Sequence, residues 1–88
     1  MQPEEAMKII KRPYVTEKTF EMVERENKLV FIVDDKASKR MVKEAVETLY
    51  KVKVSAVNTA NTIVGKKAYV RLSRESSAID LASRLGLV

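Results

Sequence analysis

Five consecutive apolar residues, Leu29 to Val33, constrain the fold of this chain more than any other stretch. The run is rich in β-branched types, is too short to form a helix on its own, and lacks the alternation of a strand with one wet face. It therefore predicts a strand that is covered on both faces and lies centrally in a sheet. A chain of 88 residues forms one domain with a modest core, which buries roughly 60 to 65% of the unfolded surface.

Helices are predicted on either side of this strand. Thr16 is a suitable N-cap for a helix that runs to about Glu26, where Asn27 can end it. Ser38 caps the clearest helix of the chain, whose apolar stripe at helical spacing consists of Val42, Ala45, Val46 and Leu49.

Two alternating runs in the second half of the chain predict an antiparallel hairpin. The first is Val52, Val54 and Ala56, and the second is Ala68, Val70 and Leu72. The polar segment from Asn58 to Val64 is expected to be a loop longer than a minimal turn. A last helix should follow Ser73 and stop at Gly86, with an apolar side formed by Ile79, Ala82 and Leu85.

The N-terminus lacks periodicity, so residues 1–6 are expected to form a flexible tail, followed by a short strand from Met7 to Ile10. The resulting order β-α-β-α-β-β-α places residues 7–88 in one domain of the α+β class. The predicted fold is an α-β plait, a split β-α-β arrangement with a mainly antiparallel four-stranded sheet and helices on both faces.

Charge and composition narrow the function. The 17 Lys and Arg against 12 Asp and Glu give a net charge of +5 and a pI near 9.6, which favours nucleic acid as a partner and an anionic membrane surface as the second candidate. The absence of Cys and His removes thiolate metal sites, the commonest metal ligand and the commonest general base, so neither a cofactor nor a catalytic site is expected. No apolar run approaches the roughly 20 residues of a membrane span, and a cytoplasmic location is expected.

Alternation on the strand around Tyr69 places two cations, Lys67 and Arg71, on the same face as this aromatic side chain. Such a face can bind phosphates and stack on bases. The alternative is that Tyr69 packs beneath the last helix while the cations protect the strand from edge pairing. Asp34 and Asp35 are interpreted as a turn and cap rather than as an acid or Mg²⁺ site.

Two further groups could contact RNA. Lys36, Lys39, Arg40 and Lys43 surround the start of the second helix, where a phosphate would explain cations that otherwise oppose the helix dipole; a solvated face is the alternative. Uncharged donors and acceptors, which turn chemistry would explain equally well, are provided by Asn58, Thr59, Asn61 and Thr62.

Three classes of function compete for this pattern. The Lys/Arg-Gly-aromatic motif of the common single-strand RNA readers is missing, so shape recognition of a folded RNA fits the dispersed cations better. A small plait-fold hydrolase of acyl phosphates would need a Gly-rich phosphate loop, and the two glycines of the chain supply none. A standalone RNA-binding regulator would bind short single strands tightly.

Short motifs in a fixed order carry a resemblance to a known family. They are Arg12-Pro13 with Val15 to Lys18, Asn27-Lys28, Asp35 to Lys39, Val57 to Thr59, and Lys66 to Val70. From about Ile9 to Val88 this order resembles the family of universal large-subunit ribosomal proteins numbered twenty-three. The ending from Ala78 to Gly86 is similar to its archaeal and eukaryotic branch.

The resemblance implies a structural constituent of the large ribosomal subunit, without catalysis, which binds large-subunit rRNA beside neighbouring ribosomal proteins at the polypeptide tunnel exit. It also implies a docking site for the signal recognition particle and other nascent-chain factors, with Glu17 as the contact. The implied rRNA contacts are Arg12, Lys18, Lys36, Ser38, Lys39, Asn58, Thr59, Asn61, Lys66, Lys67, Tyr69 and Arg71. Bacterial members insert a long hairpin that reaches into the tunnel, but here only Ala60 to Gly65 fills that place, so a rim position is expected.

Overall fold

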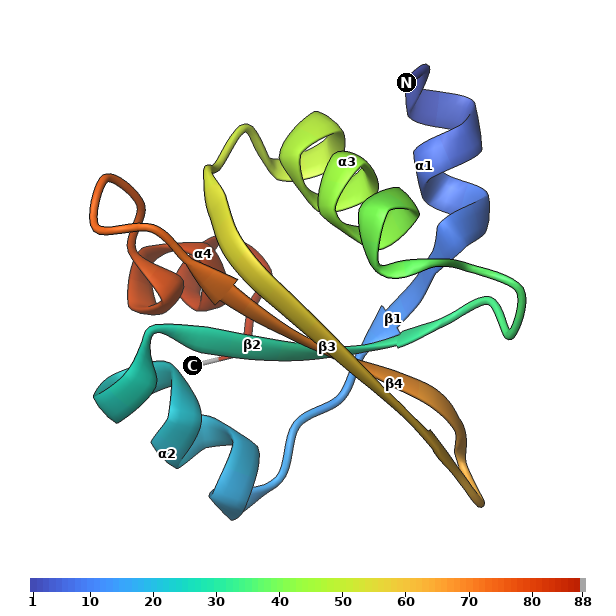
Figure 1. Ribbon diagram of the computed structural model, residues 1–88. Coiled ribbons are helices and arrows are strands. Elements are labelled where there is room, and N and C mark those ends of the chain that lie inside the picture. The colour runs from blue at the N-terminus through green and yellow to red at the C-terminus, as the bar shows by residue number, and fades with distance from the viewer. Residues whose placement is uncertain (88) are drawn as a thin grey trace.

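The computed structural model describes residues 1–87, which form four helices and four strands (Figure 1). In chain order these are α1 (Pro3–Ile9), β1 (Ile10–Pro13), α2 (Glu17–Glu26), β2 (Lys28–Val33), α3 (Lys39–Tyr50), β3 (Val54–Thr62), β4 (Gly65–Leu72) and α4 (Ala78–Arg84). The starts of α2 and α3 after Thr16 and Ser38 confirm the two predicted N-caps. None of these helices has both the length and the apolarity that crossing a membrane requires.

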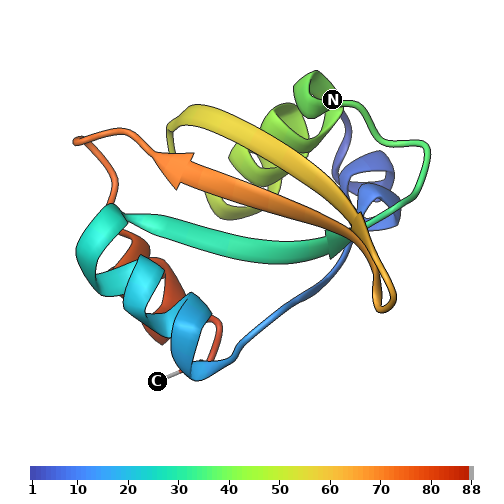
Figure 2. The ribbon, with the colours of Figure 1, turned by 60° about the horizontal axis from the view of Figure 1, so that its bottom comes forward.

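The four strands form one antiparallel sheet in the order β1-β2-β4-β3. Figure 2 shows β2, β4 and β3 side by side, with α2 alongside β2. The predicted central strand is confirmed, because β2 pairs with β1 on one side and β4 on the other, and its residues from Leu29 to Val33 are all buried.

One face of the sheet carries the hydrophobic core. Phe31 of β2 and Ala68 of β4 are paired on this face, and buried residues of all four helices, among them Ala6, Val23, Val42 and Leu81, join them in one cluster. Tyr50 at the end of α3 stacks on Phe31 with ring centroids 5.8 Å apart, and burial raises the pKa of its phenol.

The predicted class is confirmed: the chain is an α+β plait with an antiparallel four-stranded sheet. The helices are distributed less evenly over the two faces than the sequence suggested. Helices α1, α3 and α4 contribute to the core face, while α2 runs along β2 and contacts both Leu29 on the core face and Val30 on the other. Apart from the part next to α2, the second face of the sheet consists of side chains from the strands.

The N-terminus differs from the prediction. Residues from Pro3 onward are helical, and the first strand starts at Ile10 instead of Met7. Pro at the first turn, acidic residues beside it and Lys8 in the last turn suit a short helix. This helix is stabilised by packing against α3, where Ala6 becomes fully buried. Because a seven-residue helix is marginal in isolation, local patterns alone do not reveal it.

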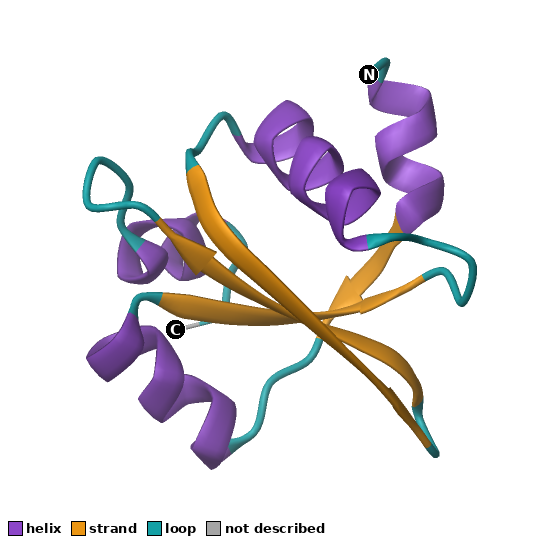
Figure 3. Cartoon of the chain, viewed as in Figure 1, coloured by secondary structure: helices purple, strands orange, loops and turns teal. Residues whose placement is uncertain are grey.

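The expected long loop between the last two strands is also wrong. Strands β3 and β4 remain paired as far as Thr62 and Gly65, which leaves a two-residue turn of Ile63 and Val64. Figure 3 shows the hairpin extending past the helices to this turn. The segment is polar because it protrudes, so that strand residues there meet water as loop residues do. Gly65 has a φ of 123°, which a residue with a Cβ rarely adopts.

Helix α4 ends near Gly86 as predicted, with φ of 75° at this glycine, but its orientation differs. It buries Ala78, Leu81 and Ala82, whereas Ile79 is 48% exposed and Leu85 is partly buried. The start of α4 is fixed from outside, since the Ala78 N–H donates to Asn27 Oδ1 at 2.7 Å. The start of this helix is therefore anchored by a residue 51 positions away.

Asn27 connects α2, β2 and the segment between β4 and α4. It takes the left-handed conformation, with φ of 56°, and ends α2 as predicted. Its Nδ2 donates to the carbonyl oxygens of Leu72, Ser73 and Ser76 at 3.0 to 3.2 Å. One polar side chain thus satisfies much of the backbone of a loop that has little hydrophobic packing of its own.

Thr16 and Thr19 form a reciprocal cap at the start of α2. The Thr19 N–H donates to Thr16 Oγ1 at 3.2 Å, and the Thr16 N–H donates to Thr19 Oγ1 at 2.7 Å. Replacing Thr16 with Ala should therefore lower the free energy of unfolding by about 1 kcal/mol, which urea denaturation would measure. Thr16→Ser keeps the hydroxyl group and should stay within about 0.5 kcal/mol of the wild type. An equal loss in both variants would contradict the capping role.

Candidate nucleic-acid interface

The second face of the sheet carries the predicted row of Lys67, Tyr69 and Arg71. Their neighbours on β4, Ala68, Val70 and Leu72, are buried on the core face, so the predicted alternation is confirmed. Tyr69 lies opposite Val30 on β2 and Asn58 on β3. It therefore lies on the face away from α4, and the alternative that it packs beneath the last helix is wrong.

Strand pairing adds Arg12 and Asn58 to this face. Arg12 is paired with Ile32, which is paired in turn with Lys67, while Asn58 lies opposite Tyr69. Directly opposed residues of antiparallel strands point to the same side of a sheet. Residues from β1, β3 and β4, far apart in the sequence, are thus brought to one face. We call this set, Arg12, Tyr14, Asn58, Lys67, Tyr69 and Arg71, the open face.

Tyr14 is the member that the sequence analysis missed. The Tyr14 N–H donates to the carbonyl of Val30 at 2.9 Å, which places the residue beside β2. The Nζ of Lys67 lies 4.0 Å from the centre of the Tyr14 ring, within the range of a cation–π contact. The available signal was the position of an aromatic residue two places after Arg12, which alternation puts on the same face.

The other predicted contacts lie elsewhere. Thr59 is paired with the buried Ala68, so Thr59, and Asn61 two residues on, belong to the helix-covered side. Lys66 also points there, and its Nζ donates to the carbonyl oxygen of Ala37 at 2.7 Å, beside the start of α3. We call the second group of predicted contacts the hairpin side. Its members are Lys36, Ser38, Lys39, Thr59, Asn61 and Lys66.

At the start of α3, hydrogen bonds within the turn and the helix cap account for the presence of Ser38, without any contact to RNA. Ser38 Oγ accepts from the Met41 N–H at 3.2 Å as the N-cap of α3, and Asp34 Oδ1 accepts from the Lys36 N–H at 2.8 Å. The interpretation of Asp34 as a turn residue is consistent with this bond. Lys36 and Lys39 are exposed.

Lys18 and Glu17 occupy the first turn of α2 and are exposed. Within residues 1–87 the ion pairs join Lys28 to Glu26 and Lys53 to Glu75, so none of the predicted rRNA contacts is neutralised by a carboxylate. Uncompensated cations spread over a surface are the usual electrostatic mark of an RNA-binding protein.

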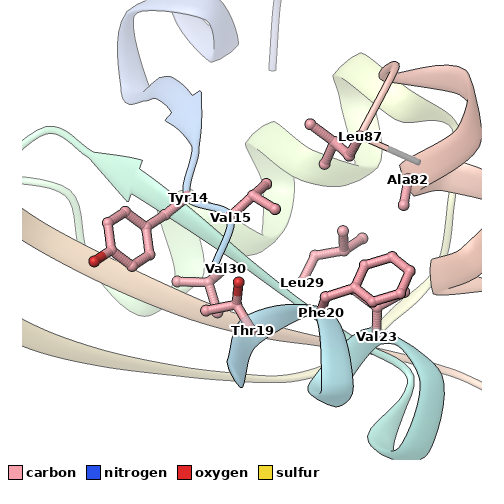
Figure 4. Close-up of a pocket in the computed structure, with 9 residues that line it drawn as sticks. All are labelled: Tyr14, Val15, Thr19, Phe20, Val23, Leu29, Val30, Ala82 and Leu87. Atoms are coloured by element: carbon pink, nitrogen blue, oxygen red, sulfur yellow. The ribbon is translucent and has the colours of Figure 1, made fainter. Parts of the chain in front are cut away.

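A small apolar hollow lies between α2, β2 and the end of α4. Figure 4 shows side chains from these elements, and from the segment before α2, around it. Its volume is about 10 Å³, room for at most one water molecule, and its lining is almost entirely apolar. The hollow is therefore a packing feature and not a substrate site.

Comparison with known proteins identifies the family. The family model described as ribosomal protein L23 matches residues 8–77, which is well over half of the chain. The chain belongs to the ribosomal protein L23 family. The resemblance drawn from the short motifs is confirmed.

Relatives in archaea and eukaryotes support this assignment. Large ribosomal subunit protein uL23 of Pyrobaculum aerophilum is 52% identical over 81 residues, which is 91% of this chain and all of the relative. Its counterpart in Haloarcula marismortui is 52% identical over 80 residues, or 90% of this chain and 94% of the relative. The chain spans about half of the Tetrahymena thermophila uL23, which is 47% identical over 81 residues, covering 91% of this chain and 54% of the relative.

Membership of the L23 family supports a structural role in the large ribosomal subunit. It implies association with rRNA and with other ribosomal proteins, and the family is structural rather than enzymatic. Which side chains contact the RNA stays a prediction from the geometry described above.

Proposed function

We propose that the chain, α1 included, acts as a single rRNA-binding domain at the polypeptide tunnel exit, with the open face as the main RNA contact. The observation that supports this most strongly is the alignment of Lys67, Tyr69 and Arg71 in one row on a face that α1, α3 and α4 leave uncovered. Two tyrosines provide flat rings for bases or riboses, and three cations provide partners for phosphates.

The hairpin side would provide a second contact on the opposite side of the β3–β4 hairpin. Lys36 and Lys39 are exposed and can reach RNA, whereas Lys66 already donates to the carbonyl oxygen of Ala37. A folded RNA with two neighbouring helices could hold the hairpin between them. Shape recognition of this kind suits a protein whose cations are spread over several elements.

The proposed docking site for the signal recognition particle and other nascent-chain factors is the start of α2. Glu17 is exposed there, and Val15, two residues before it, is 47% exposed. A carboxylate next to an apolar side chain offers both charge and contact area to a protein partner. The two-residue turn of the hairpin suits a place at the rim of the tunnel rather than inside it.

Crosslinking in native cell extract, where large subunits and other RNAs are both present, tests the proposed location. A photoreactive amino acid at Tyr69 should crosslink to large-subunit rRNA, and one at Glu17 should crosslink to the signal recognition particle when it is bound. Crosslinks from Tyr69 confined to messenger or other small RNAs would overturn the proposal in favour of a regulator.

Glu17→Ala should weaken factor docking without affecting RNA binding. The loss of one exposed charge contact amounts to about 0.5 to 1 kcal/mol, or roughly two- to fivefold in affinity. Binding of the signal recognition particle to subunits that contain the variant would be measured by co-sedimentation. Glu24→Ala, also exposed on α2, is the matched control and should leave the affinity unchanged. A loss of rRNA binding in the Glu17 variant would show that the docking surface is misplaced.

A further inference from the structure

A basic cleft lies at one end of the open face, where α2 ends, β2 begins and β4 ends. Its volume is about 380 Å³, and it is lined by Arg25 from the last turn of α2, Arg71 from β4 and Arg74 from the following loop. We call these three residues the arginine cleft. Arg25 and Arg74 did not stand out in the sequence, and only the fold brings them to Arg71.

The charge of this cleft is unbalanced. Within residues 1–87 none of the three guanidinium groups forms an ion pair. Glu26 is the acidic residue in the lining, but its Oε1 lies 3.3 Å from the Nζ of Lys28 and is neutralised there. Arg25 also complements the dipole of α2, which explains one cation at this place but not the other two. Three like charges around one depression repel each other unless an anion lies between them.

The backbone beneath the cleft is held in place. Asn27 Nδ2 donates to the carbonyl oxygens of Leu72 and Ser73, and the Leu72 N–H donates to the Asn27 carbonyl at 2.9 Å. Ser55, at the bulge in β3, donates through Oγ to the carbonyl of Arg71 at 3.2 Å. The segments that carry Arg71 and Arg74 are therefore held close to the end of α2, so the backbone beneath the cleft is in place before any ligand arrives.

Arg71 belongs to both the cleft and the open face. It lies four residues from Lys67 along one strand, a distance of about 13 Å at the usual rise per residue. A nucleic-acid strand that crosses the open face along β4 would lead its next phosphates into the cleft. The planar fork of arginine matches the paired oxygens of a phosphodiester, which favours Arg over Lys at such a place.

From these observations we infer that the arginine cleft binds consecutive phosphates of an RNA backbone and extends the RNA contact beyond the sheet to the end of α2. This inference rests on the proposed rRNA binding and specifies where the bound strand leaves the open face. An acidic protein segment would also meet the charge of the cleft, but it would not explain the continuity with the tyrosines of the open face.

The test measures how the affinity of the full chain for Pyrobaculum aerophilum large-subunit rRNA depends on salt. The double variant Arg25→Gln/Arg74→Gln should lower the slope of log affinity against log salt by about 1.4 to 1.8, since each lost phosphate contact removes about 0.7 to 0.9. Arg25→Lys/Arg74→Lys retains both charges and should retain most of the slope. Arg84→Gln removes a cation on α4, outside the cleft, and should leave the slope unchanged.

Each result bears on one proposal. An unchanged slope for the double Gln variant, together with a lower slope for Lys67→Glu, would overturn the cleft and leave the open face standing. If no variant changes the slope, the proposed rRNA contact itself is wrong. A double Gln variant that binds the RNA normally but fails to bind another large-subunit protein would also overturn the inference, in favour of an acidic protein segment.

Discussion

Reversing both charges beside Tyr69, in the variant Lys67→Glu/Arg71→Glu, should lower the affinity for large-subunit rRNA on the order of a hundredfold at moderate salt. Each residue stands to lose a charge-assisted contact of about 1.5 kcal/mol, and the two losses together correspond to that factor. The slope of log affinity against log salt should fall by about 1.4 to 1.8. Filter binding at a series of salt concentrations measures both quantities.

The control for this variant is Lys8→Glu/Lys51→Glu, which makes the same change in net charge at exposed positions away from the open face. It should weaken RNA binding far less. The number of counterions released from the RNA depends on the contacts at the interface, not on the total charge of the protein. Equal losses in both double variants would mean that net charge alone holds the RNA, and the open face would lose its special role. Thermal unfolding of both variants checks that the fold is intact.

Asn27→Ala should destabilise the chain by about 3 kcal/mol. Alanine is strained in the left-handed conformation by about 1 kcal/mol, and the loss of the bonds to the segment between β4 and α4 adds about 2 kcal/mol. For a domain of this size the melting temperature should fall by roughly 12 to 24 °C. Calorimetry or circular dichroism of the purified chain measures this change.

Two further substitutions at Asn27 separate the causes. Asn27→Gly adopts the left-handed backbone conformation without strain but loses every hydrogen bond of the side chain. Its free energy of unfolding should therefore remain about 2 kcal/mol below that of the wild type. Asn27→Asp retains the acceptor for Ala78 and tolerates the left-handed region, but it loses the donor to three carbonyl groups. A loss below about 1 kcal/mol in the alanine variant would contradict the proposed role of Asn27.

Several elements were predictable because their cause is local. Thr16 and Ser38 cap helices through bonds to residues three positions away, and those bonds depend on neighbours in the sequence alone. The short apolar run from Leu29 to Val33, rich in β-branched residues, predicted a buried central strand from its own composition. Alternation along one strand, likewise a local property, was sufficient to put Lys67 and Arg71 on one face with Tyr69.

The errors concern features whose cause lies outside the segment. Helix α1 is stabilised by packing against α3, and the start of α4 is anchored by Asn27, and neither contact can be derived from the residues of the helix itself. The paired strands from Asn58 to Gly65 resemble a loop because they protrude from the molecule. Local propensity gives no information on where a segment lies relative to the core.

Patterns along the chain were enough to predict the class of fold, the central strand, the cationic character and, through the order of short motifs, the family of this chain. Which of its cations lie near one another depends on the tertiary structure. It placed Tyr14 beside Lys67, brought the Lys66 ammonium group to the carbonyl oxygen of Ala37, and gathered Arg25 and Arg74 around Arg71. The physical reason is that sheet order and register join segments that are distant along the chain, and these pairings follow from burial of the whole core rather than from any single stretch of residues.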